Sequence, residues 1–380
     1  MRSALSSPKK KRIVVKIGSH VLSEGGQFTH AAVQCLADQL IEVARAGNEV
    51  LLITSGAILM GRNLMGLDLD LYPQNLRQSL AAVGQVSLIH EYQNIFDRLG
   101  QPIGQILLNL EDFNNRRRYL SLKETILGLF KLKVLPILNE NDCIHTEDFS
   151  FGDNDNLAAQ VAGMLDADLL LILSTVDGLY DGHPEHPDSR VIHTVEAITP
   201  RMLEDARSKR QLLSTGGMAA KLQAIDKAVH FGVPVVLANG EAPDILRRLF
   251  AGEEVGTLFL PETKRMPLKK RWLAYSTKVK GQVVVDDGAY QAITERNASL
   301  LSKGVVDSRG DFESQDVVTI VNTEGREFAR GITHYGCEDL KKIAGLSSSE
   351  IEKTLGVKYF DEVVHREELV LLPTRIKGKT

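Results

Sequence analysis

Ile13-Val14-Val15-Lys16-Ile17-Gly18-Ser19 is a short apolar run that contains one lysine and ends in a glycine turn. Five further apolar runs of strand length follow in the first two-thirds of the chain. They span residues 50–54, 103–108, 134–138, 169–174 and 234–238. Each run is continuous rather than alternating, which is typical of strands covered on both faces. The pattern therefore predicts several buried, parallel strands.

Helical patterns separate these runs. Thr29 is placed to cap a helix through residue 46, and further helices are predicted over 73–99, after Asn156, and over 218–231. Strands that alternate with helices predict an α/β fold with a mostly parallel sheet sandwiched by helices. Ligands in such sheets bind beyond the carboxyl ends of the strands. The loops that follow strands are therefore the places to look for chemistry.

The pattern changes near residue 262. The segment 261–267 and the basic run 269–271 are typical of a linker. Short strand-like pieces follow, and a hairpin is predicted at Asn322-Thr-Glu-Gly325. These pieces span residues 282–285, 317–321, 328–332 and 369–372. We expect two domains, residues 1–262 and a small β-rich domain over residues 275–380.

The composition of the chain argues against several classes of protein. A length of 380 residues suits two domains, and a net charge of -4 gives no electrostatic reason to expect a nucleic-acid binder. Cys35, Cys143 and Cys337 are far apart in the sequence, which argues against a disulfide framework and suits a reducing cytoplasm. No apolar run approaches the roughly 18 residues of a membrane helix. We expect a cytoplasmic protein with no membrane partner.

Two strand ends carry candidate anion-binding groups. A lysine in an apolar strand is costly to bury without an anion, so Lys16 is either a phosphate-facing lysine or a lysine that reaches solvent at a strand edge. Ser55, Gly56 and Ala57 open the helix after the second strand. Their N–H groups form either an anion site or an ordinary serine cap.

An acidic region follows the strand at 134–138. Its carboxylates are Glu140, Asp142, Glu147, Asp148, Asp153 and Asp155. A calcium loop is one interpretation, but the required spacing is missing. A solvated acidic loop is the second. The third is a pocket for a ligand ammonium, in which Asp155 faces cationic groups near a phosphate and the amides of Asn139 and Asn154 add hydrogen bonds.

A glycine pair precedes the helix at 218–231. Ser214-Thr215-Gly216-Gly217-Met218-Ala219-Ala220-Lys221 resembles a phosphate cradle, with a lysine one turn into the helix. The Walker A pattern and the Rossmann glycine fingerprint are both absent. Phosphoryl transfer needs cations and firm positioning rather than covalent help. Lys16, Lys221 and a metal-bound nucleotide would meet that need.

Taken as a set, the motifs resemble the glutamate 5-kinase family of the amino-acid kinase superfamily. They occur in the family's order, at residues 14–18, 54–58, 81–85, 139–142, 152–157 and 215–221. The resemblance implies ATP-dependent phosphorylation of the γ-carboxylate of L-glutamate to γ-glutamyl phosphate, with Mg²⁺, in the first step of proline biosynthesis. A free amino acid brings an ammonium that the acidic region can pair. An N-acetylated glutamate would leave those carboxylates unpaired.

The resemblance also implies residue roles. Lys16 and Lys221 would hold the transferring phosphoryl group, and Asp155 would orient both lysines. The glutamate side would be Ser55, Gly56, Ala57, Asn139, Asp142 and Asn154. The ATP side would be Lys16, Ser174, Thr175, Thr215, Gly216, Gly217, Met218, Ala219, Ala220 and Lys221. The family often has Thr-Asp where this chain has Ser174-Thr175. That departure puts side-chain contacts to ATP there in doubt.

The tail resembles a PUA domain at residues 281–286, 300–305 and 329–331. PUA domains are best known in RNA-modifying proteins, so an RNA-binding module is the alternative function. Residues 275–380 hold slightly more acidic than basic residues, which disfavours RNA as the main partner. The resemblance instead implies proline as a feedback inhibitor, glutamyl-phosphate reductase as pathway partner, and a homo-oligomer.

Overall fold

The structure is a computed structural model that describes residues 9–67, 74–144, 154–184, 186–208, 217–261, 268–276, 279–358 and 360–372. The chain divides into two compact units. One comprises Met1–Asp112 and Arg116–Arg265, and the other comprises Phe113–Asn115 and Met266–Thr380. Each unit has a hydrophobic core of its own.

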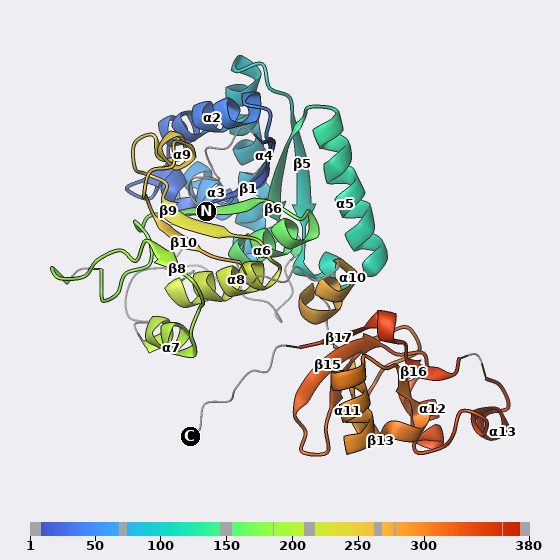
Figure 1. Cartoon of the computed structure of the whole chain (residues 1–380). Helices are drawn as coiled ribbons and strands as arrows, with labels where there is room; N and C mark the ends of the chain where they lie inside the picture. The colour runs from blue at the N-terminus through green and yellow to red at the C-terminus, as the bar shows by residue number, and fades with distance from the viewer. Residues whose placement is uncertain are drawn as a thin grey trace. The chain divides into compact units, whose positions relative to one another are not determined.

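The first unit is built on an eight-stranded sheet of order β5-β6-β4-β1-β7-β9-β10-β8 (Figure 1). Its strands are β1 (Arg12–Ile17), β4 (Glu49–Ile53), β5 (Ile103–Leu108), β6 (Leu135–Glu140), β7 (Leu169–Ser174), β8 (Thr194–Val195), β9 (Val235–Asn239) and β10 (Thr257–Phe259). All pairings from β5 to β9 are parallel, and only β9 and β10 pair antiparallel. The predicted mostly parallel sheet is confirmed.

Helices cover this sheet. They are α2 (His30–Arg45), α3 (Ala57–Met65), α4 (Gln74–Arg98), α5 (Arg116–Lys131), α6 (Asn154–Met164), α7 (Pro200–Ser208), α8 (Met218–His230) and α9 (Ile245–Phe250). A two-stranded ribbon, β2 (Ser23–Glu24) with β3 (Gln27–Phe28), precedes α2. Ile13, Val15 and Ile17 of β1 share one core with α2, α4 and α9. Because side chains alternate along a strand, Lys16 faces the opposite side of the sheet.

The structure differs from the predictions at three places. The helix predicted after Asn156 begins at Asn154, so that Asp155 lies in its first turn. Thr29 does occupy the N-cap of α2, but its side chain makes no capping hydrogen bond. The residues 103–108 also form an edge strand of mixed burial rather than a strand covered on both faces. An edge strand has a neighbour on one side only, so its apolar run does not report full burial.

The second unit contains a five-stranded sheet of order β13-β11-β14-β15-β17. Its strands are β11 (Gly281–Val285), β13 (Val305–Gly310), β14 (Val317–Val321), β15 (Glu327–Ile332) and β17 (Leu369–Leu371), and β12 (Leu300–Leu301) pairs with β16 (Glu362–Val364). The predicted hairpin joins β14 to β15, and Gly325 has a φ of 76° in its turn. The helices are α10 (Leu268–Arg271), α11 (Asp287–Arg296), α12 (Cys337–Ile343) and α13 (Ile351–Leu355).

The linker prediction for the basic run 269–271 was wrong, because these residues form α10. This helix continues into a π-helical turn at Trp272–Ser276. Lys269 forms an ion pair with Glu368, with 2.8 Å between Nζ and Oε1. A tertiary partner of this kind stabilises a short helix whose charged sequence alone indicates a linker.

Candidate active site

Two lysines share one carboxylate at the carboxyl end of the sheet. Lys16 near the end of β1 places Nζ 2.7 Å from Asp155 Oδ1. Lys221 in the first turn of α8 donates to Asp155 Oδ2 at 3.0 Å. Lys16 and Asp155 are each only 5% exposed. Three residues that are far apart in the sequence therefore form one charged cluster, defined here as the lysine–aspartate cluster.

The electrostatics of this cluster keep Asp155 ionised. Burial alone would raise the pKa of Asp155, but the positive charges of Lys16 and Lys221 outweigh burial and hold that pKa below its ordinary value. Each carboxylate oxygen faces a different ammonium group. Asp155 therefore sets the separation and direction of both cations.

A chain of side-chain hydrogen bonds lies beside this cluster. Asn154 Nδ2 donates to Ser55 Oγ at 2.9 Å and to Asn139 Oδ1 at 3.1 Å. Asn139 Nδ2 donates to Gln85 Oε1 at 2.7 Å. Asn139 is only 2% exposed and Gln85 only 8%. We call Gln85, Asn139, Asn154 and Ser55 the amide relay.

The loop of Ser55, Gly56 and Ala57 connects β4 to α3. Gly56 is the N-cap of α3 with a φ of 108°, a left-handed conformation that favours glycine. No side chain caps this helix start. Its first N–H groups are therefore available for an anion, and Ser55 lies half-buried at the same helix end.

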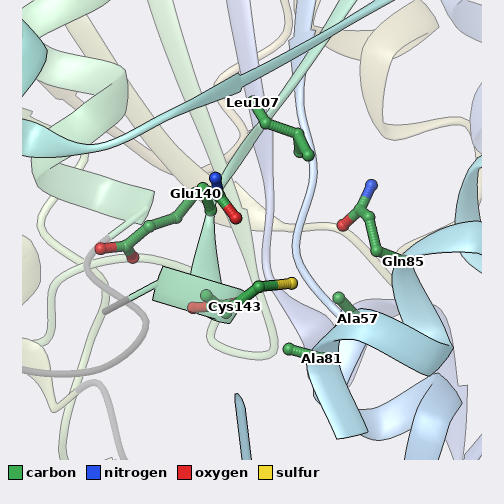
Figure 2. A pocket seen from close by; sticks show the side chains of 8 residues that line it. Ala57, Ala81, Gln85, Leu107, Glu140 and Cys143 are labelled. Atoms are coloured by element: carbon green, nitrogen blue, oxygen red, sulfur yellow. The ribbon is translucent and has the colours of Figure 1, made fainter. Parts of the chain in front are cut away.

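Asp142 lies beside the relay in a 3₁₀ turn, Asp142–Ile144, and is 8% exposed. A small pocket opens here, and Figure 2 shows Gln85 and Ala57 on one side of it and Glu140 on the other. Asp142 and Cys143 also line this pocket. Burial and the nearby charge of Asp142 raise the pKa of the Cys143 thiol, so this thiol stays protonated at neutral pH.

The predicted ATP side is described in part. Gly217 is the N-cap of α8, and Met218, Ala219 and Ala220 form its first turn with Lys221. Ser174 ends β7 and its carbonyl accepts from the Gly240 N–H at 2.8 Å, while Thr175 is exposed. Thr215 and Gly216 lie outside the described residues.

Known proteins are similar to this chain over almost all of its length. The Amino acid kinase family matches residues 11–239, and the PUA domain matches residues 281–355. "Glutamate 5-kinase" of Caldanaerobacter subterraneus subsp. tengcongensis is 41% identical to this chain, and the similarity covers 95% of this chain and 98% of that protein. The chain belongs to the glutamate 5-kinase family. "Glutamate 5-kinase" of Geobacter sulfurreducens is 40% identical over 98% of this chain and 100% of its own.

Among solved structures, UMP kinase from Ureaplasma parvum is 16% identical over 66% of this chain and 99% of its own, with a TM-score of 0.47. The family membership rests on the sequence relatives. As a glutamate 5-kinase, the chain phosphorylates L-glutamate with ATP in the first step of proline biosynthesis. No helix among the described residues is long and apolar enough to cross a membrane.

Reasoning from the sequence missed one residue of the site. Gln85 belongs to the motif at residues 81–85 but received no role. The available signal was its position directly after Gly84, where α4 contacts the start of α3. A Cβ built on Gly84 would lie 1.8 Å from the Ala57 carbonyl oxygen. A glycine that permits such a close contact brings the next residue of the helix near the loop of Ser55, Gly56 and Ala57.

Proposed function

We propose that Lys16 and Lys221 bind and stabilise the phosphoryl group during its transfer, and that Asp155 orients both lysines. The observation that carries the proposal is the single buried carboxylate between two ammonium groups, 2.7 and 3.0 Å away. A γ-carboxylate oxygen of glutamate attacks the γ-phosphorus of ATP. A new P–O bond forms as the bond to the β-phosphate oxygen breaks, and ADP leaves with the electron pair.

Charge spreads over the phosphoryl oxygens and the leaving oxygen in this transition state. Fixed cations stabilise such charge because they need no reorganisation when the reaction occurs. Asp155 holds the two lysines before ATP arrives, so the structure supports this form of preorganisation.

On the substrate side, we place Ser55, the N–H groups of Gly56 and Ala57, Asp142 and Asn154, with Asn139 behind them. The uncapped start of α3 supports binding of a carboxylate. Asp142 supplies negative charge for the substrate ammonium. The arrangement matches a free amino acid, which carries both charges.

On the nucleotide side, we place Ser174 and Thr175 with the loop and first turn at 215–221. The start of α8 supports phosphate binding because its N-cap is a glycine, which has no side chain to cap the first N–H groups of the helix. Mg²⁺ would arrive on the ATP phosphates, as this ion usually takes one or two protein carboxylates and several waters. Among the described residues, no group of three His, Cys, Asp or Glu side chains could hold a metal ion.

The wider assignment is also a proposal. We assign residues 1–262 to the catalytic domain and 275–380 to the PUA domain, and we place the protein in the cytoplasm. Proline is proposed as its feedback inhibitor and glutamyl-phosphate reductase as its pathway partner. We further propose a homo-oligomer, with a regulatory or oligomerisation role for the PUA domain in preference to RNA binding.

The test is ATP turnover with Mg²⁺, comparing L-glutamate, N-acetyl-L-glutamate and L-aspartate, with hydroxylamine to trap the acyl phosphate as hydroxamate. Hydroxamate from L-glutamate alone is the expected result. Hydroxamate from N-acetyl-L-glutamate would contradict the assigned role of Asp142, because that substrate has no ammonium. Hydroxamate from L-aspartate would contradict the fit of the site to the longer side chain.

A further inference from the structure

The backbone N–H of Glu140 fixes the direction of the amide relay. It donates to Asn139 Oδ1 at 2.9 Å and to Asn154 Oδ1 at 3.2 Å. A backbone N–H can only donate, so both amide oxygens must face it. The orientation of these two amides is therefore set by the main chain of β6.

The two amide nitrogens then point away from Glu140. The nitrogen of Asn139 donates to Gln85 Oε1, and the nitrogen of Asn154 donates to Ser55 Oγ. The Gln85 oxygen completes the relay as the acceptor for Asn139. With Gln85 in place, the amides of Asn139 and Asn154 each have one orientation in which the oxygen and the nitrogen are both hydrogen-bonded.

Ser55 is the open end of the relay. Its Oγ accepts from Asn154, so its hydroxyl hydrogen must point elsewhere. Among the described residues, no acceptor is recorded for that hydrogen, and Ser55 is half-buried beside the uncapped start of α3. The hydroxyl is therefore prepared to donate to a ligand that accepts only.

We propose that Gln85 is a positioning residue of this kinase, which acts through Asn139 and Asn154 to fix the Ser55 hydroxyl as a donor to a carboxylate of glutamate. The inference rests on the proposed placement of the substrate at Ser55. A carboxylate offers only acceptors, so the relay favours it over any group that presents an N–H to Ser55. Asn139 acts within the relay, because both of its polar side-chain atoms are hydrogen-bonded inside the protein.

The fixed position of Gln85 follows from helix packing. Gly84 lets the backbone of α4 approach the start of α3 so closely that a Cβ there would lie 2.3 Å from the Gly61 nitrogen. Gln85 is the next residue of α4 and shares the pocket wall with Ala57 (Figure 2). The side-chain oxygen of Gln85 is therefore held at a set distance from the loop of Ser55, Gly56 and Ala57.

The test compares Gln85→Met with Gln93→Met, a control on the exposed face of the same helix. Gln85→Met is expected to raise the KM for glutamate about 3- to 10-fold, the factor that one net hydrogen bond carries. The KM for ATP and kcat should stay within about twofold, and Gln93→Met should match the wild type in all three constants. An unchanged glutamate KM in folded Gln85→Met would overturn the proposal.

A double-mutant cycle with Ser55→Ala tests the route. If Gln85 acts through the Ser55 hydroxyl, Gln85→Met should raise the glutamate KM no further in the Ser55→Ala background. An equal rise in both backgrounds would refute this route. If Gln85→Met does not fold, the glutamate KM of Ser55→Ala still tests whether the Ser55 hydroxyl binds the substrate. A glutamate KM unchanged by Ser55→Ala overturns both the inference and the substrate placement, whereas a KM raised by Ser55→Ala but not by Gln85→Met overturns the inference alone.

Discussion

Asp155 is an ionised carboxylate in a position where burial alone would favour its neutral form. Its two lysine partners reverse that preference, and the three side chains are held together without a ligand. Removing one partner of such a buried pair leaves an uncompensated charge, which is more damaging than losing an exposed ion pair. The chemistry of the site and its stability therefore depend on the same contacts.

Lys221→Ala is expected to lower kcat by about 100-fold or more while the KM for glutamate changes little, because this lysine acts mainly in the transition state. Lys227→Ala is the matched control. Lys227 lies on the same helix, but its Nζ donates to Asn156 rather than to Asp155. Steady-state kinetics with hydroxamate detection measures both variants. A kcat for Lys221→Ala equal to that of the control would refute the assigned role.

Asp155→Asn is expected to destabilise the protein by about 3 kcal/mol at pH 7. The folded-state pKa of Asp155 is lowered, so its stabilising contribution is present above the unfolded-state pKa, about 3.9, and is lost as pH falls through the folded-state pKa. The difference between variant and wild type should therefore shrink below about pH 4. Urea unfolding at several pH values measures this difference in the free energy of unfolding. A difference that stays constant in acid would exclude an ionised Asp155.

The sequence analysis names the charged residues of the proposed site and three members of the amide relay, but it does not name Gln85. A lysine in an apolar strand and a lysine after two glycines are local signals, because each conflicts with its immediate neighbours. Gln85 shows no such conflict with its neighbours, because a glutamine is ordinary in a polar helical pattern, and the pattern does not reveal that Gln85 is buried. Its role depends on a contact 54 positions away with Asn139, which only the folded chain brings together.

The crossing of α3 and α4 positions the loop of Ser55, Gly56 and Ala57. Two glycines make this crossing tight. A Cβ on Gly61 would lie 2.0 Å from the Leu80 carbonyl oxygen, and one on Gly84 would lie 1.8 Å from the Ala57 carbonyl oxygen. Both contacts are with backbone atoms, which cannot move aside as a flexible side chain can. Any larger residue must therefore separate the helices.

Gly84→Ala is expected to destabilise the protein by about 1–3 kcal/mol and to raise the KM for glutamate, because it moves α4 away from Ala57. Gly128→Ala is the control. Gly128 lies within α5, and a Cβ there would meet no atom within 4 Å. The control should gain up to about 1 kcal/mol from helix propensity. Thermal unfolding and kinetics of both variants check the prediction, which fails if Gly84→Ala is as stable as the wild type.

Secondary structure was predictable where the local pattern and the tertiary environment agree. The central strands β1 and β7 each contain a continuous run of buried apolar residues, at Ile13–Val15 and at Leu169–Leu173, so periodicity finds them. α10 and the short strand β8 were not found, because each depends on partners elsewhere: Glu368 for α10 and β10 for β8. Their own sequences are too short and too polar to show their structure.

The two units of the chain have separate hydrophobic cores. Ile13 and Leu40 belong to the core of the first unit, and Ile320 and Leu340 belong to that of the second. Every proposed catalytic or binding residue lies between residues 16 and 221 of the first unit. The second unit therefore contributes no proposed contact to the reacting groups.

A chain truncated after residue 262 is expected to retain hydroxamate formation from L-glutamate, with kcat and both KM values within about threefold of the full chain. The physical reason is that the first unit buries its own core and carries the whole proposed site. The full-length protein at the same concentration is the control. A folded but inactive truncated chain would show that residues 263–380 take part in forming the site.

The carboxylate between the two lysines also affects what the protein does between turnovers. A monovalent anion that approaches Lys16 and Lys221 finds both cations already paired with Asp155. This anion must compete with the carboxylate of Asp155, which is covalently part of the protein. A nucleotide competes better, because it brings several negative charges and makes additional contacts. We therefore expect Asp155 to weaken the binding of small inorganic anions at Lys16 and Lys221 more than it weakens the binding of a nucleotide.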